Sequence, residues 1–265
     1  MNFSLKDRYN MDDLIEIMKI VRSPEGCMWD RSQSHKSIRS CVIEEAYEVS
    51  DAIDREDDKA LCEELGDLLL QVVYHAEIAE EEGKFNIDDI ADGISKKLIR
   101  RHPHIFGDKK LSSPEEISAE WDRIKAEEKG QETFSQRAEA VPKNFPALMR
   151  SQKVRSRLAK SGFDYPDVEA ALENTEAEIR ELRAAIANKD EENTFEELGD
   201  VLFSTVNVAR FLDMDAETAL TKSCEKFMAR FKQLEELAEK KGIDTQKSTL
   251  EELNNLWSTV KSTGV

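Results

Sequence analysis

The sequence is poor in positive charge. Its 265 residues include 38 Lys or Arg against 56 Asp or Glu, which gives a formal net charge of −18. Phosphate backbones and anionic lipids are bound mainly through clustered Lys and Arg, so this deficit argues against a nucleic-acid partner or a membrane surface. An anionic ligand would need a local source of positive charge, such as a metal ion.

Cysteine, proline and glycine are also scarce, at four, six and ten residues. The cysteines lack the spacing of a metal site, so we expect reduced, buried thiols at Cys27, Cys41, Cys62 and Cys224. The first ten residues do not resemble a signal peptide, and we expect a cytoplasmic protein. A hydrophobic content of 39% is nevertheless too high for a disordered chain.

Long hydrophobic runs are missing as well. The longest apolar stretches are interrupted within a few residues by charged or amide side chains, as in DLLLQVVYH at 67–75. No segment is therefore expected to span a bilayer, and we expect a soluble protein. Convincing alternation of apolar and polar residues is absent too, which disfavours strands and predicts an all-α fold.

The chain does contain an internal repeat. EELGD occurs at 63–67 and again at 196–200, and a shift of 133 residues (63 onto 196) aligns the two copies with the apolar residues that follow. Small changes of shift extend the match, bringing Lys97 and Arg101 onto Lys226 and Arg230, and Trp121 and Lys125 onto Trp257 and Lys261.

The repeat predicts two domains of similar fold. A polar segment that ends with two prolines separates the copies and is the natural linker. We predict an N-terminal domain at 1–130, a linker at 131–142 and a C-terminal domain at 143–265, each an antiparallel helical bundle. The helices that open with EELGD are apolar nearly all round, which predicts central positions in their bundles.

Each copy carries two acid pairs at helical spacing. Members of a pair are three residues apart and so share one helix face. The interval between the pairs is long enough for one helix to end and the next to return antiparallel, so the pairs are expected to face each other. They are Glu45 with Glu48 and Glu64 with Asp67 in the first copy, and Glu178 with Glu181 and Glu197 with Asp200 in the second.

Four converging carboxylates would repel one another unless a cation lies between them. Ligation by oxygen alone, without Cys or His, favours Mg²⁺, with Mn²⁺ as a substitute, and Mg²⁺ commonly takes up substrate phosphates. Phosphate-ester or anhydride hydrolysis is the chemistry this site predicts. Gly66 and Gly199 lie inside these helices at a cost of roughly 1 kcal/mol each relative to Ala, which close approach of a helix or a ligand would explain.

Other interpretations of the acids are weaker. A single Glu-x-x-Glu in so acidic a chain is most simply a solvated helix face, but duplication of the four-acid spacing reverses that preference. A di-iron bundle would carry Glu-x-x-His motifs, and none is present. His75 is two turns beyond Asp67, yet its repeat partner is Val208, so a core or surface histidine is the simpler interpretation.

EEAYE at 44–48 followed by ELGD at 64–67 resembles the MazG nucleoside triphosphate pyrophosphohydrolases, in the long form with two tandem MazG domains. Further stretches carry the same resemblance: PEGCMWD at 24–30, RRHPHIF at 100–106, FPALMRSQKV at 145–154 and GFDY at 162–165. The resemblance covers nearly the whole chain. It implies Mg²⁺-dependent hydrolysis of nucleoside triphosphates to the monophosphate and pyrophosphate, as nucleotide housecleaning, by homodimers or higher homo-oligomers.

Catalysis is expected mainly at Glu178, Glu181, Glu197 and Asp200, because two-domain members of the family favour the C-terminal domain. Glu45, Glu48, Glu64 and Asp67 would form a second, catalytically silent metal site. Basic residues and a tryptophan of the second copy are expected to bind the nucleotide, although surface ion pairs and core packing would equally explain them: Lys222, Lys226, Arg230, Trp257 and Lys261.

The two copies also differ. Ala177 replaces Glu44 in the second, and Gly93 stands in the first where the second has Lys222. Three alternatives stay open: a narrower deoxynucleoside triphosphate pyrophosphatase, a silent sensor of Mg²⁺ and nucleotide, and a structural helical dimer with solvated acids.

Overall fold

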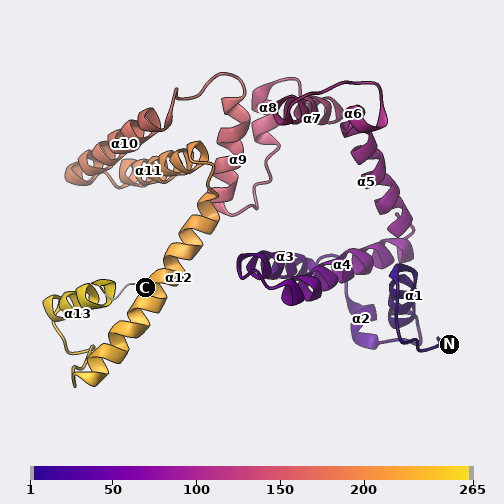
Figure 1. The fold of residues 1–265 in the computed structure, drawn as a ribbon, viewed down its shortest axis with the longest axis horizontal. Helices are drawn as coiled ribbons and strands as arrows, with labels where there is room; N and C mark the ends of the chain where they lie inside the picture. The colour runs from indigo at the N-terminus through magenta and orange to yellow at the C-terminus, as the bar shows by residue number, and fades with distance from the viewer. Residues whose placement is uncertain (1–2, 263–265) are drawn as a thin grey trace. The chain divides into compact units, whose positions relative to one another are not determined.

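The computed structural model describes residues 3–262, and within that range every regular element is a helix (Figure 1). The all-α prediction is confirmed. The chain divides into two compact units, Met1–Ile124 and Lys125–Val265. The boundary falls inside one helix, and the predicted linker at 131–142 contains a helix of its own.

The first unit is built around an antiparallel hairpin of α3 and α4, against which α1 and α5 pack. Figure 1 shows the two hairpin helices side by side. The helices of this unit are α1 (Met11–Arg22), α2 (Met28–Ser32), α3 (Arg39–Asp54), α4 (Asp58–Glu81), α5 (Ile87–Arg101), α6 (Pro103–Phe106) and most of α7 (Pro114–Glu128).

The second unit repeats this hairpin as α10 and α11, with α9 packed against α11. The long helix α12 packs on α9 and α11 near its start and on α13 near its end. The helices of this unit are α8 (Phe134–Glu139), α9 (Ala147–Ala159), α10 (Val168–Asn188), α11 (Glu191–Phe211), α12 (Ala216–Lys240) and α13 (Leu250–Ser262).

The two hairpin turns are alike in backbone conformation. Glu56 and Lys189, which the shift of 133 residues superimposes, both adopt left-handed conformations, with φ of 54° and 57°. Such φ values are uncommon outside glycine, so their recurrence marks a conserved turn geometry between the copies. The next residues, Asp57 and Asp190, both cap the following helix through a side-chain oxygen. The repeat is therefore structural as well as sequential.

The core of the first unit lies where α1 and the second half of α4 meet, around Met18, Val73, Tyr74 and Ile78. Tyr74 donates its hydroxyl proton to the carbonyl oxygen of Asp30 at 2.8 Å, and the Arg22 guanidinium lies 5.3 Å from its ring centroid. Burial raises the pKa of Tyr74 to about 12, so the hydroxyl stays protonated. In the second unit, Leu234, Ala238, Leu256 and Val260 form a cluster between α12 and α13.

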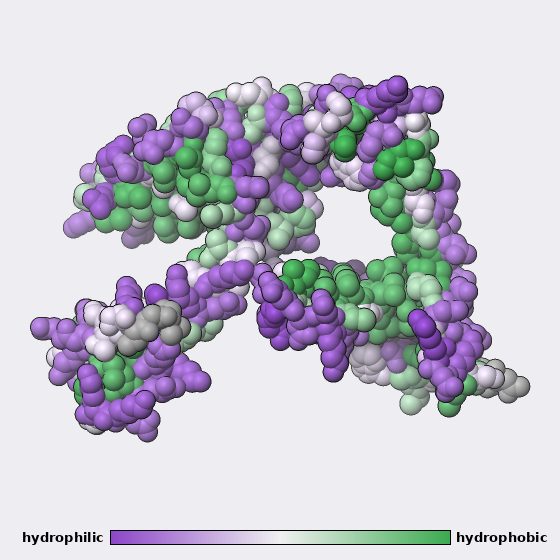
Figure 2. All heavy atoms as spheres, viewed as in Figure 1, coloured by the Kyte–Doolittle hydropathy of each residue, from purple (hydrophilic) through white to green (hydrophobic). Residues whose placement is uncertain are grey.

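The prediction that the EELGD helices are central to their bundles is only half right. The second half of α4 is buried, but Leu65 and Leu69 in its first half are 49% and 40% exposed, and Leu198 and Leu202 on α11 are 48% and 53% exposed. Figure 2 shows apolar surface along both hairpins. Each unit by itself supplies too few helices to cover this face.

The expectation of buried thiols is wrong. Cys27, Cys62 and Cys224 are exposed and Cys41 is half-buried, all as free cysteines. Cys62 and Cys224 lie on faces of α4 and α12 that no other helix covers. Within the described residues, no helix combines the length and the apolar character that crossing a membrane requires.

Replacing Glu120 by Gln should lower the free energy of unfolding at neutral pH. Lys109 Nζ and Arg123 Nη2 lie 2.6 and 2.7 Å from its carboxylate oxygens, and the hydrogen bonds from Arg123 and then Lys109 lower the pKa of Glu120 from 4.5 to about 2. A lowered pKa means that the ionised form stabilises the fold above about pH 4.5 and that this contribution is lost as the pH falls toward 2. In urea titrations, the difference between parent and Glu120→Gln should shrink from pH 7 to about pH 3.5; a constant difference would contradict this assignment.

Candidate functional site

The hairpin of the first unit brings three acidic side chains together. Glu45 and Glu48 on α3 and Glu64 on α4 each offer an oxygen within 4.8 Å of the others, and we call them the first carboxylate cluster. Burial, followed by the charges of Asp67 and Glu48, raises the pKa of Glu45. Asp67 is therefore close enough to act electrostatically, although it is not one of the three.

The hairpin of the second unit forms a matching group. Glu178 on α10 and Glu197 and Asp200 on α11 offer oxygens within 4.8 Å of one another, and they form the second carboxylate cluster. Burial, followed by the charge of Glu181, raises the pKa of Glu197, with smaller effects of Asp200 and Glu178. All four predicted acids of this copy thus influence one another, with Glu181 more exposed than Glu178 or Glu197.

An amide supports the corresponding carboxylate in each copy, but from a different helix. Gln71 Nε2 on α4 donates to Glu45 Oε1 at 3.4 Å, whereas Asn174 Nδ2 on α10 donates to Glu178 Oε1 at 3.3 Å. Such neighbours orient a carboxylate and limit its rotamers, as the groups behind metal ligands commonly do. The copies solve one positioning problem with unrelated residues.

The clusters suit a hard divalent cation. Each supplies only carboxylate oxygens, the ligand type that Mg²⁺ and Mn²⁺ prefer. The raised pKa values of Glu45, Glu64 and Glu197 show that desolvation and mutual repulsion disfavour the ionised forms, a conflict that a bound cation would remove. The donor set therefore fits the metal that the sequence predicts.

A cavity of about 170 Å³ opens beside the second carboxylate cluster. Glu178 and Asp200 form part of its wall, so a molecule inside it would lie against the cluster. The remaining wall comes from α9, the loop that follows it, α10 and α11: Arg155, Tyr165, Asn174, Phe203, Ser204 and Asn207.

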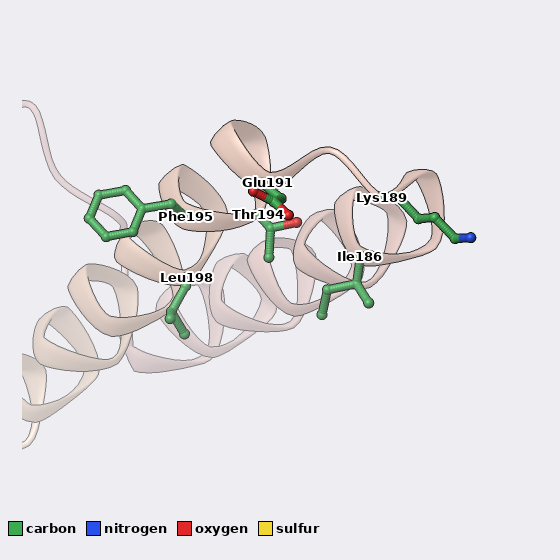
Figure 3. A pocket seen from close by; sticks show the side chains of 6 residues that line it. All are labelled: Ile186, Lys189, Glu191, Thr194, Phe195 and Leu198. Carbon is green, nitrogen blue, oxygen red and sulfur yellow. The ribbon is translucent and has the colours of Figure 1, made fainter.

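A second hollow, of about 540 Å³, lies at the far end of the same hairpin, where α10 turns into α11 (Figure 3). Ile186, Leu198 and Phe195 give it an apolar wall, and Phe195 is 80% exposed. Its polar groups, among them Lys189 and Glu191, lie at the turn and do not converge on one point (Figure 3). This hollow thus resembles uncovered apolar surface more than a site for chemistry.

The predicted nucleotide-binding residues of the second copy lie on α12 and α13. Trp257 packs against the α12–α13 cluster, with its ring centroid 5.1 Å from that of Phe227, and Lys261 Nζ lies 5.8 Å from the tryptophan ring. Lys222 and Lys226 are exposed and Arg230 is half-buried. None of the five predicted residues lines the cavity beside the second carboxylate cluster, and their nucleotide contacts stay a prediction.

Close approach of a helix does not explain the glycines of EELGD. A Cβ atom built on Gly66 or Gly199 would meet nothing within 4 Å. No neighbouring helix of the described chain needs the space, so that part of the expectation is wrong. A ligand or a second chain is the remaining source of a close approach.

His75 is outside both carboxylate clusters, as the sequence indicates. Its Nδ1 lies 2.7 Å from Nδ1 of His35, and the two rings stack with centroids 5.0 Å apart. Burial, followed by the charge of His35, lowers the pKa of His75, so the neutral ring is favoured. The pair joins the segment before α3 to α4.

The sequence analysis missed the residues that line the cavity. Arg155 and Tyr165 lie outside the aligned acid motifs, and nothing in the spacing places them near Glu178. One signal was available: the shift of 133 residues aligns Asn207 with Tyr74, a change from a large aromatic to a small amide in an otherwise similar helix.

Comparison with known proteins identifies related chains. The family model described as the MazG nucleotide pyrophosphohydrolase domain matches residues 33–106 and again 167–234. The chain is 46% identical to a nucleoside triphosphate pyrophosphohydrolase/pyrophosphatase MazG of Thermotoga maritima, over 94% of this chain and 95% of that protein. It is 43% identical to a nucleoside triphosphate pyrophosphohydrolase of Escherichia coli K12, over 95% and 97%.

Glu197→Gln should raise the midpoint of thermal unfolding by about 2 °C when a chelator removes divalent cations, because one repelling charge is lost. With excess Mg²⁺ the parent should gain stability and the variant should gain less, since cation binding stabilises only the state that holds it. Differential scanning fluorimetry with and without Mg²⁺ measures both effects. Glu236→Gln, an exposed site on α12, is the matched control; an equal gain for parent and Glu197→Gln would contradict cation binding at this cluster.

Proposed function

Because the chain belongs to the MazG family, we propose that it hydrolyses nucleoside triphosphates between the α- and β-phosphates, with Mg²⁺, mainly at the second carboxylate cluster. The observation that carries this proposal is the pair of carboxylate clusters, one in each repeat. Nucleoside monophosphate and pyrophosphate would be the products.

Glu178, Glu181, Glu197 and Asp200 would hold the metal in the second unit, with the three clustered oxygens as the nearest set. Bound there, Mg²⁺ supplies charge neutralisation for the phosphate oxygens and for the departing pyrophosphate. Asn174 keeps the carboxylate of Glu178 oriented. Mn²⁺ is a plausible substitute because it accepts the same ligands.

Hydrolysis adds water across one anhydride bond. The water oxygen forms a bond with the α-phosphorus while the bond from that phosphorus to the bridging oxygen breaks, and pyrophosphate leaves. A carboxylate of the cluster that is free of the metal orients this water and accepts its proton. Cationic side chains of α12, namely Lys222, Lys226 and Arg230, are proposed to hold the β- and γ-phosphates, with Trp257 and Lys261 at the base.

Two observations favour the second cluster as the working one. The cavity beside it gives a substrate a place against Glu178 and Asp200. The loss of Glu44 in the second copy removes little, because Glu44 is exposed and is not one of the three residues of the first carboxylate cluster. The first cluster is then a structural or regulatory metal site.

We also propose that the protein works as a homodimer or higher homo-oligomer, in the cytoplasm and away from nucleic acid and membranes. The apolar faces of both hairpins support self-association: residues at equivalent positions of the two repeats, Leu65 with Leu198 and Leu69 with Leu202, are about half exposed. A second copy of the chain carries complementary apolar surface and would remove it from water.

Product analysis tests the activity. The parent, given Mg²⁺ and a panel of ribo- and deoxynucleoside triphosphates, should release monophosphate and pyrophosphate. The double variant Glu178→Gln, Glu197→Gln should lose at least about 100-fold in kcat/KM, as removal of metal-binding groups commonly does. Glu45→Gln with Glu64→Gln is the matched control and should retain most activity.

The alternatives give other outcomes in the same assay. Cleavage of only one or two deoxynucleotides would establish a narrow pyrophosphatase. Stabilisation by Mg²⁺ and nucleotide without any product would establish a sensor, and full activity in the Glu178, Glu197 variant would move catalysis to the first cluster.

Leu65→Asp combined with Leu198→Asp should shift the protein from dimer or larger assembly toward monomer, because a charge cannot be buried unpaired in an apolar interface. Analytical ultracentrifugation at several protein concentrations measures the change. Leu5→Asp, at a position 88% exposed near the amino end, is the control and should leave the assembly intact. A parent that is already monomeric would refute self-association through these faces.

A further inference from the structure

Asn207 on α11 contains a buried hydrogen-bond donor with no partner. The residue is 2% exposed, it lines the cavity beside the second carboxylate cluster, and its Nδ2 makes no hydrogen bond. Its Oδ1 accepts a hydrogen bond from Arg210 Nε at 2.9 Å. A guanidinium only donates, so this contact identifies the oxygen end of the amide and leaves the NH₂ end as the unpaired group.

The orientation of this amide is fixed from behind. Arg210 Nη2 donates to both carboxylate oxygens of Asp164, at 2.5 and 2.7 Å. Turning the Asn207 amide over would place its NH₂ group against the Arg210 guanidinium. The chain Asp164, Arg210, Asn207 therefore holds two N–H groups ready inside the cavity wall. A buried donor left unpaired is destabilising, and its retention calls for an acceptor that comes from outside.

A second unpaired donor lies nearby. The guanidinium of Arg155 lies 5.7 Å from the ring centroid of Tyr165 and 5.7 Å from that of Phe203, and its buried Nε has no hydrogen-bond partner. The hydroxyl of Ser204 already donates to the carbonyl oxygen of Val201 at 2.9 Å. The cavity thus offers unpaired N–H groups from Asn207 and Arg155 between aromatic side chains.

The first repeat shows what fills the same place when no ligand is taken. Tyr74 occupies the position of Asn207, and its ring is buried under Arg22 with the hydroxyl bonded to Asp30. Its side chain satisfies its own polar group and leaves no unpaired donor. Replacing that tyrosine by Asn207 in the second repeat removes a large side chain and exposes an amide to the cavity.

We propose that this cavity receives the nucleobase of the substrate, and that Asn207 Nδ2 and Arg155 Nε select a base edge with two neighbouring acceptors, as in cytosine or guanine. The assignment rests on the proposed function. A neutral ring suits the cavity better than a phosphate does, because Glu178 and Asp200 line the same wall and would repel an anion. At about 170 Å³ the cavity is below the roughly 300–1,000 Å³ of drug-sized sites, so it holds one part of a nucleotide only.

Base selectivity in Asn207 variants tests the proposal. Asn207→Asp keeps an acceptor for Arg210 but replaces the donor with an acceptor, so kcat/KM for CTP and GTP should fall about 10- to 100-fold relative to ATP and UTP. Asn207→Tyr, which copies the first repeat, should raise KM for all four nucleotides while Mn²⁺ binding to the parent and the variant stays equal. Asn144→Asp, at an exposed position before α9, makes the same chemical change elsewhere and should match the parent.

Failure of this proposal is separable from failure of the activity. If the parent cleaves nucleotides and Asn207→Asp lowers kcat/KM equally for all four, the base assignment is overturned and the hydrolase function stands. If the parent cleaves none, calorimetric titration with CMP decides: binding that is lost in Asn207→Asp supports the cavity as a base site, and equal binding by parent and variant overturns it.

Discussion

The structure depends on mutual repulsion among carboxylates that two antiparallel helices hold together. Each hairpin positions acids three residues apart on facing helices, so that three of them offer oxygens within 4.8 Å of one another. The tight turns at Glu56 and Lys189, with the helix caps at Asp57 and Asp190, fix the register of these helices. Repulsion of this kind weakens a fold unless something outside the chain compensates it, which makes the clusters sites for a cation rather than supports of the core.

Duplication allows the two copies to be compared within one chain. Both retain the turn, the cap and the acid spacing, which are the features that a cation site needs. They differ where the nucleotide would have to be recognised: Tyr74 is packed and hydrogen-bonded, whereas its counterpart Asn207 leaves a donor unpaired beside a cavity. Selection has thus acted separately on metal binding and on the space beside it, and only the second copy combines the two.

The sequence predicts most of the fold, because helices report themselves through local spacing. Residues three apart share a face whatever the tertiary structure, so Glu45 with Glu48 and Glu197 with Asp200 could be placed before any coordinates existed. Spacing does not report how far each side chain reaches, and Asp67 and Glu181 are outside the three-residue clusters for that reason. Arg155 and Tyr165 reach the cavity from α9 and the loop that follows it, a contact that no local pattern encodes.

The same limit explains why the EELGD helices were expected to be central. Apolar character all round a helix reports that every face will be covered, but not which chain covers it. Within one chain, Leu65 and Leu198 stay about half exposed, and each directly follows a cluster acid, Glu64 or Glu197. The face that a partner would cover and the carboxylates that a cation would bind are therefore neighbours on one helix. Association and cation binding then restrain the same hairpin, so each is expected to strengthen the other by thermodynamic linkage, because whatever orders the hairpin first reduces the entropy that the second must overcome.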